Sequence, residues 1–163
     1  MKRIILFVCL AAALRMSGLL PFSGSDVADL VPVEALTVDW QHGQVVLDGG
    51  ECSGSGEDWS AALADLYAGA EGQVFLGTTE QVILSESALR LLPDVIRSKE
   101  LRPAAVICVC KGPLPDPQKA AAYLSAHAAG LTLRQAQAAM VQEKAVALPI
   151  LYNKEGGLRL GRS

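Results

Sequence analysis

Hydrophobic and polar positions alternate over much of residues 31–39, and we interpret this stretch as a strand. Pro32 lies near the start of this stretch, so the strand is at a sheet edge or has proline as its first residue. A His-Gly pair at 42–43 predicts a turn before a second short strand over 44–48. Residues 33–48 are therefore predicted to form a β-hairpin.

The spacing changes to that of a helix after a stretch rich in glycine and serine. Residues 49–58 predict a flexible loop. Trp59, Ala62, Leu63, Leu66 and Tyr67 then recur at helical spacing. A capping box of Ser55 with Asp58 is predicted at the start of this helix, and Gly69 is predicted to end it.

Two strand-like stretches flank a helical one in the middle of the chain. Residues 74–84 predict a strand region in which Gly77 marks a bulge or a close backbone approach. Residues 85–99 predict a helix, with Pro93 in the first turn of its second half. The apolar run at 104–110 predicts a central strand that is buried on both faces.

The last third of the chain shows two helix starts and a hairpin. Asp116 is the expected N-cap of a helix over 117–129 that Gly130 closes. Thr132 and Gln135 form the second predicted capping box. The remaining predicted elements are a helix from this box to about Lys144 and a hairpin of residues 148–152 with 158–160.

This order of elements predicts the fold class. Strands alternate with helices across residues 33–144, which favours an α/β (α+β) fold with a mixed sheet covered by helices. The chain has 163 residues, of which 51% are hydrophobic, enough for one domain with its own core. We expect a single domain over residues 26–163.

Residues 1–25 have the composition of a signal peptide or an N-terminal membrane anchor. Lys2 and Arg3 precede an apolar run over 4–14 that Arg15 ends, too short to span a bilayer by itself. Small residues after Pro21 are typical of a signal-peptidase site before Asp26, and an uncleaved anchor is the alternative. The place of a lipid-bearing cysteine at the end of the run is taken by Phe22, Ser23 and Gly24, so no lipidation site is expected.

Charge and cysteine content narrow the function classes. The net charge is −3, and no cluster of Lys and Arg offers a surface for phosphates, so nucleic acid is not an expected partner. Three cysteines, Cys52, Cys108 and Cys110, remain after the signal. An odd number does not predict a disulfide framework.

The search for reactive groups yields no catalytic, cofactor-binding or metal-binding residues. Cys108 and Cys110 lie two apart on a predicted strand, so they share a face, and we interpret them as core thiols. His42 and His127 have no neighbouring residues that indicate a catalytic base. A phosphate site in the glycine-rich loop is disfavoured by Glu57 and Asp58.

Several stretches resemble the N-terminal domain of the Ger(x)C family, the C subunits of spore germinant receptors. The matching stretches, in chain order, are DVADLVPVEALTVD, SGSGEDWSAALADL, VFLGTTEQVILSESAL, LPDVIRSKELRPAAVICVCKG, GLTLRQAQAAM and ALPIL. Gly77, Glu86 and the Lys111-Gly112 pair stand at places that match the family. The family's lipid-bearing cysteine is missing, and Thr78 replaces the histidine or other residue often found after the strand glycine.

The resemblance implies a non-enzymatic, extracytoplasmic, membrane-associated subunit that works by binding proteins during spore germination. The implied partners are membrane-spanning germinant receptor subunits, and no cofactor is implied. Family members continue into further domains, so this chain is expected to be a solitary N-terminal domain. Two alternatives are a small exported thiol protein or enzyme built around Cys108 and Cys110, and a shortened relative that has lost its receptor role.

Overall fold

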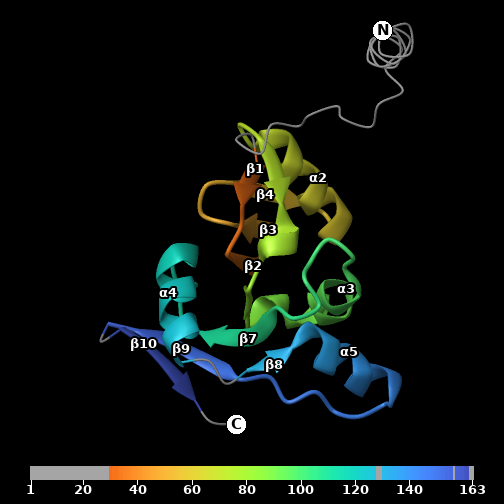
Figure 1. Ribbon diagram of the computed structural model, residues 1–163, viewed down its shortest axis with the longest axis vertical. Coiled ribbons are helices and arrows are strands. Elements are labelled where there is room, and N and C mark those ends of the chain that lie inside the picture. The colour runs from red at the N-terminus through yellow and green to blue at the C-terminus, as the bar shows by residue number, and fades with distance from the viewer. Residues whose placement is uncertain (1–29, 128–129, 156, 162–163) are drawn as a thin grey trace, which may run out of the picture.

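A mixed eight-stranded sheet forms the centre of the computed structural model, which describes residues 30–127, 130–155 and 157–161 (Figure 1). The strand order is β10-β9-β7-β6-β2-β3-β4, with β8 beside β7. β2, β6, β7 and β9 run parallel, and the outer strands pair antiparallel. The strands are β2 Ala35–Gln41, β3 Gln44–Asp48, β4 Ser53–Gly56, β6 Gln81–Ser85, β7 Val106–Lys111, β8 Leu131–Thr132, β9 Ile150–Lys154 and β10 Gly157–Gly161. The predicted mixed α/β single domain is confirmed.

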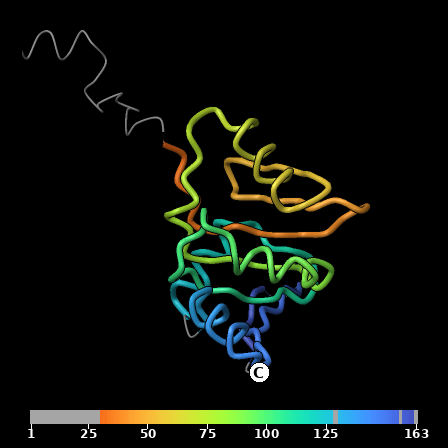
Figure 2. The backbone as a smooth tube through the Cα atoms, turned by 90° about the vertical axis from the view of Figure 1, so that its right-hand side faces the viewer, coloured from red at the N-terminus to blue at the C-terminus, as the bar shows by residue number. Residues whose placement is uncertain are grey.

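Helices cover both faces of the sheet unequally (Figures 1 and 2). On one face α2 (Trp59–Gly69), α3 (Leu92–Arg97) and α5 (Leu133–Val141) bury a larger core, which includes Leu36, Leu66 and Ile107. On the other face α4 (Pro117–His127) alone buries a smaller core. Beyond the reach of α4, the β3 and β4 side chains on that face are exposed or half-buried.

The central strand is β7, as the apolar run at 104–110 predicts. Ile107 points into the larger core, and Cys108 and Cys110 point into the smaller one. All three residues are buried because parallel strands with helices on both faces have no solvent side.

Local signals place most turns and helix ends correctly. His42 and Gly43 both have positive φ, as a two-residue hairpin turn between β2 and β3 requires. Thr132 and Gln135 form the predicted capping box of α5. Asp116 Oδ1 accepts a hydrogen bond from Lys119 N at 3.0 Å at the start of α4. The C-terminal hairpin is β9 with β10.

Two helix boundaries differ from prediction. Asp58 alone caps α2, since its side chain accepts from Ala61 N and Ser55 belongs to a strand. α5 ends at Val141 rather than near Lys144, because Glu143 takes a left-handed φ of 55°. Residues 128–129, the predicted end of the helix that starts at Pro117, lie outside the described residues.

The two long predicted strands, 31–39 and 74–84, are each interrupted. β1 (Leu30–Pro32) pairs with β5 (Gln73–Phe75) in a separate small parallel sheet, while β2 pairs with β6. The pairing of β1 with β5 and the pairing of β2 with β6 differ in register by three residues. The 3-10 helix η2 (Leu76–Thr78), between β5 and β6, accommodates these extra residues. Gly77, predicted to mark a bulge or a close backbone approach, lies in this 3-10 turn, and a Cβ there would lie closest to the Phe75 side chain.

The predicted helix over 85–99 is confirmed in part. It forms the 3-10 helix η3 (Ser87–Leu91) followed directly by α3, with Pro93 in the first turn of α3. Proline has no N–H, so it is tolerated in the first turn of a helix. For the same reason Pro93 cannot donate a hydrogen bond to the preceding turn, and one continuous α-helix over 85–99 does not form. The helix ends at Arg97, and Ser98 N bonds to Val95 O.

The prediction of a flexible loop over 49–58 is wrong for Ser53–Gly56, which form strand β4. Gly54 and Gly56 alternate with Ser53 and Ser55, and both glycines face α2. A Cβ on Gly54 would lie 2.6 Å from Ala62 O, and one on Gly56 would lie 2.7 Å from Ala61 Cβ. The helix therefore packs directly on the strand backbone, a contact that any side chain would prevent.

Helix side chains bind the backbone of both edge strands. Ser55 N on β4 donates to Asp65 Oδ2 of α2 at 2.8 Å. Leu160 N on β10 donates to the Tyr123 hydroxyl of α4 at 3.1 Å. Each edge thus has one outward backbone donor satisfied by a helix.

Candidate functional site

The thiols of Cys108 and Cys110 are buried, as predicted, at 1% and 0% exposure. They pack with Ile83, Leu124 and Leu151 between the sheet and α4. Burial, with a smaller contribution from Cys110, raises the pKa of Cys108 to about 12, and burial also raises the pKa of Cys110. Both side chains are therefore protonated and shielded at neutral pH.

We expect Cys108 and Cys110 to resist alkylation in the native protein. Because a thiolate is the nucleophile, native labelling at pH 8 is expected to be about a hundredfold or more slower than in urea. Peptide-level mass spectrometry after iodoacetamide treatment measures each site separately. Rapid native labelling of Cys108 would contradict the packing and support the thiol-protein alternative.

The two histidines lie in separate settings. His42 occupies the β2–β3 turn. His127 is exposed in the last turn of α4, where its ring stacks on Tyr123 at 4.2 Å and its Nδ1 lies 2.8 Å from Tyr123 O. Within the described residues, no three His, Cys, Asp or Glu side chains are grouped so that they could hold a metal ion.

A polar network lies where β2 and β6 end. Asp39 Oδ1 accepts hydrogen bonds from Ser87 Oγ at 2.9 Å and from Trp40 N at 2.8 Å, and Ser87 Oγ lies 2.8 Å from Ser85 Oγ. Partial burial acts to raise the pKa of Asp39, but hydrogen bonds from Ser85, Gln41, Ser87 and Trp40 outweigh it and lower the pKa. Its donors come from its own strand and from the β6–η3 junction, so this network joins these segments.

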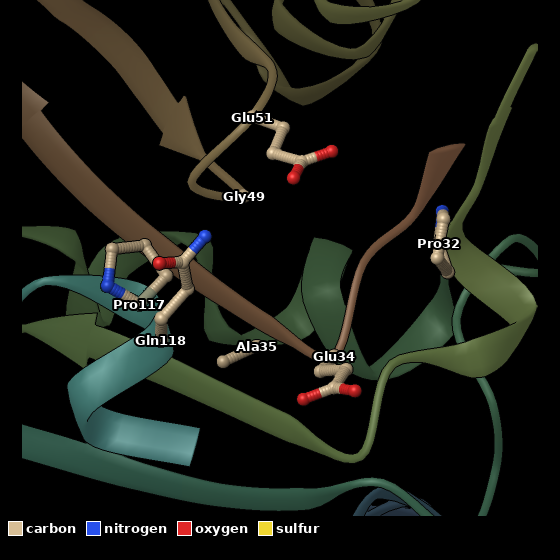
Figure 3. A pocket seen from close by; sticks show the side chains of 7 residues that line it. All are labelled: Pro32, Glu34, Ala35, Gly49, Glu51, Pro117 and Gln118. Carbon is tan, nitrogen blue, oxygen red and sulfur yellow. The ribbon is translucent and has the colours of Figure 1, made fainter. Parts of the chain in front are cut away.

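A pocket of about 230 Å³ opens beside the start of α4 (Figure 3). Three segments far apart in the sequence build it: the β1–β2 connection, the β3–β4 connection and the first turn of α4. Ala35 is almost fully buried in it, and its small side chain leaves the space open. The lining residues are Pro32, Glu34, Ala35, Gly49, Glu51, Pro117 and Gln118.

Backbone hydrogen bonds hold the walls of this pocket. Glu34 O accepts from Glu80 N at 2.8 Å and from Gln81 N at 3.1 Å. Gly49 N donates to Cys52 O, and Gly50 N donates to Asp48 Oδ1, both at 2.8 Å. The connection that carries Glu51 is therefore an ordered turn.

The lining of the pocket is acidic. The carboxylates of Glu34 and Glu51 lie across the opening from each other, and the described lining includes no Lys, Arg or His (Figure 3). A volume of about 230 Å³ is below the range of about 300–1,000 Å³ usual for small-molecule sites. Its size and charge suit a single basic side chain.

Comparisons of the chain with protein-family models, with curated proteins and with solved structures find no match. The described helices are all too short or too polar to cross a membrane, and the predicted signal or anchor lies outside the described residues. Sequence reasoning did not indicate Glu34, Glu51 or Gln118. No local signal marks them, because only the folded chain brings their three segments together.

Proposed function

We propose that the chain is an exported, membrane-associated interaction module of the spore germinant receptor type, without catalytic activity. In this proposal the pocket between Glu34 and Glu51 receives a Lys or Arg side chain from a membrane-spanning receptor subunit. The pocket carries the proposal, since two opposed carboxylates and a side-chain-sized volume suit a partner's cation better than a free substrate.

Two other features support this reading. The order of the matching stretches resembles the Ger(x)C N-terminal domain, whose members work by binding proteins. The buried thiols, with the raised pKa of Cys108, count against the alternative of a protein built around reactive Cys108 and Cys110.

The test is co-purification in detergent with the membrane-spanning subunits expected to be encoded beside this chain. We expect wild type to recover both subunits, and Glu34→Gln with Glu51→Gln to recover about fivefold less or lower, because the cation loses both carboxylates. The matched control is Glu57→Gln with Glu71→Gln, two exposed carboxylates outside the pocket, which removes the same charge.

The outcomes separate the two parts of the proposal. If wild type recovers neither subunit, the receptor assignment is wrong. If the pocket variant recovers as much as the control variant, the receptor assignment stands and the role of the pocket is wrong.

A further inference from the structure

One face of the β9–β10 hairpin places an aromatic ring among three cations. Tyr152 pairs directly with Lys111 on one side and with Arg159 on the other, so their side chains share a face of the sheet. Lys154 is two residues along β9 on the same face, and its Nζ lies 5.8 Å from the Tyr152 ring centroid. We call Lys111, Tyr152, Lys154 and Arg159 the hairpin face.

The opposite side of the hairpin fixes this face in place. Leu151 is buried in the smaller core, and Leu158 and Leu160 pack against that core. Leu160 N also donates to the Tyr123 hydroxyl. The hairpin face is therefore presented by a two-stranded ribbon that α4 holds from behind.

The hairpin face is open and concave. Lys154 and Arg159 are exposed, and Tyr152 is half-buried. A hollow of about 560 Å³ is lined by Tyr152, Lys154, Gly157 and Arg159. The Tyr152 ring lies close over Gly161, since a Cβ there would be 2.7 Å from Tyr152 Cε2. Glycines therefore leave space beside the ring that larger residues would fill.

Most of the positive charge on this face is not neutralised within the described residues. Their ion pairs are Arg102 with Glu80 and Lys111 with Glu86, the latter at 3.9 Å, and neither includes Lys154 or Arg159. Glu155, in the adjoining turn, is the nearest acidic residue in sequence. In a chain of net charge −3, this concentration of cations favours an anionic partner.

We propose that the hairpin face binds an acidic segment of a partner protein. Arg159 suits bidentate contact with a carboxylate, Lys154 supplies a second cation, and Tyr152 supplies rigid apolar contact area. This proposal rests on the proposed function, because it identifies a second surface of the same interaction module.

The position of the face favours a protein over the membrane. The described chain begins at Leu30 in β1, at the end of the molecule opposite the β9–β10 hairpin in both views (Figures 1 and 2). If residues 1–25 hold the protein at the membrane, the β9–β10 hairpin lies at the end of the molecule away from that attachment. Nucleic acid is disfavoured because three cations beside one ring do not form the extended basic surface that a phosphate backbone requires.

The test is fluorescence anisotropy with the full chain in neutral phosphatidylcholine nanodiscs. The probe is a labelled peptide rich in Asp and Glu, and its control is the same peptide with Asn and Gln. We expect the acidic probe alone to bind, more weakly as salt increases, and Lys154→Gln with Arg159→Gln to weaken it about tenfold. The charge-matched control variant is Lys119→Gln with Arg134→Gln, exposed cations on α4 and α5, which should bind as wild type does.

Three results would overturn the proposal. The first is that the two double variants bind the acidic peptide equally well, or that the wild type binds the acidic peptide and its Asn/Gln control equally well. The second is a single-stranded oligonucleotide that displaces the acidic probe and binds more tightly than it. The third is an effect of Lys154→Gln with Arg159→Gln on binding to vesicles containing phosphatidylglycerol but none on the peptide. Any of these leaves the co-purification test of the proposed function unaffected, so the two failures are distinguishable.

Discussion

Replacing both Gly54 and Gly56 by alanine is expected to unfold the chain or to remove a large part of its stability. Each new Cβ would overlap the backbone of α2, at Leu66 N and Ala62 O for position 54 and at Ala62 N for position 56. Helix backbone cannot move aside as a flexible side chain can. Overpacking usually costs about 1–3 kcal/mol per site, and backbone clashes lie at or above the upper end.

Two such clashes together cost about 6 kcal/mol or more, a large part of the roughly 5–15 kcal/mol by which native domains are stable. Circular dichroism with urea titration measures the effect, and the single variants should each show a large fall in the unfolding midpoint. Gly69→Ala is the matched control, because the nearest atom to its Cβ would be Ser53 O at 3.7 Å. This helical position should be neutral or more stable by up to about 1 kcal/mol. Native-like stability of the double variant would contradict the packing of α2 on β4.

Ile107→Ala is expected to lower the free energy of unfolding by about 2–5 kcal/mol. Ile107 is fully buried on the central strand β7, where neighbouring strands and the larger core surround it. Removing its outer atoms leaves a cavity that cannot readily close, because β6 on one side and β8 on the other hold the backbone of β7 in place. Equilibrium urea unfolding at neutral pH gives the value.

Cys108→Ala is the matched comparison for this effect. It changes the next residue of β7, on the opposite face and in the smaller core, and it removes only a sulfur atom. We expect a loss of about 1 kcal/mol. Equal losses for the two variants would contradict the tight packing of Ile107 in the larger core.

Local signals in the sequence predicted much of the fold. Correct predictions came from features that depend on residues close together in the chain, whose backbone preferences follow from their residue types. These features are the central strand, the His42-Gly43 turn and the Thr132 capping box. The strand at 31–39 is expected to be continuous because no turn residue follows Pro32 in this stretch. Its interruption depends on η2, which belongs to a segment some forty residues away.

The strand β4 was missed because its inward positions have no side chain. Ser53, Gly54, Ser55 and Gly56 do alternate with a period of two, but alternation is normally recognised from apolar residues facing a core. Here the inward residues are glycines that allow a helix to approach, so the stretch resembles a flexible linker. Its strand conformation depends on pairing with β3 and on contact with α2.

The candidate surfaces were not predictable from local pattern. Glu34 and Glu51 are separated by a hairpin, and Gln118 follows much later. The hairpin was predicted from residues 148–160, but the cross-strand register that aligns Lys111, Tyr152 and Arg159 was not. Long-range pairing sets such alignments, and a single sequence does not specify it.

The two hydrogen bonds from the sheet edges to Asp65 and Tyr123 bear on self-association. An open edge can template the addition of another chain's strand, which leads to filaments. Here an incoming strand would have to displace a helix side chain at Ser55 on one border and at Leu160 on the other. The fold thus discourages sheet growth between copies of the chain wherever their local concentration is high.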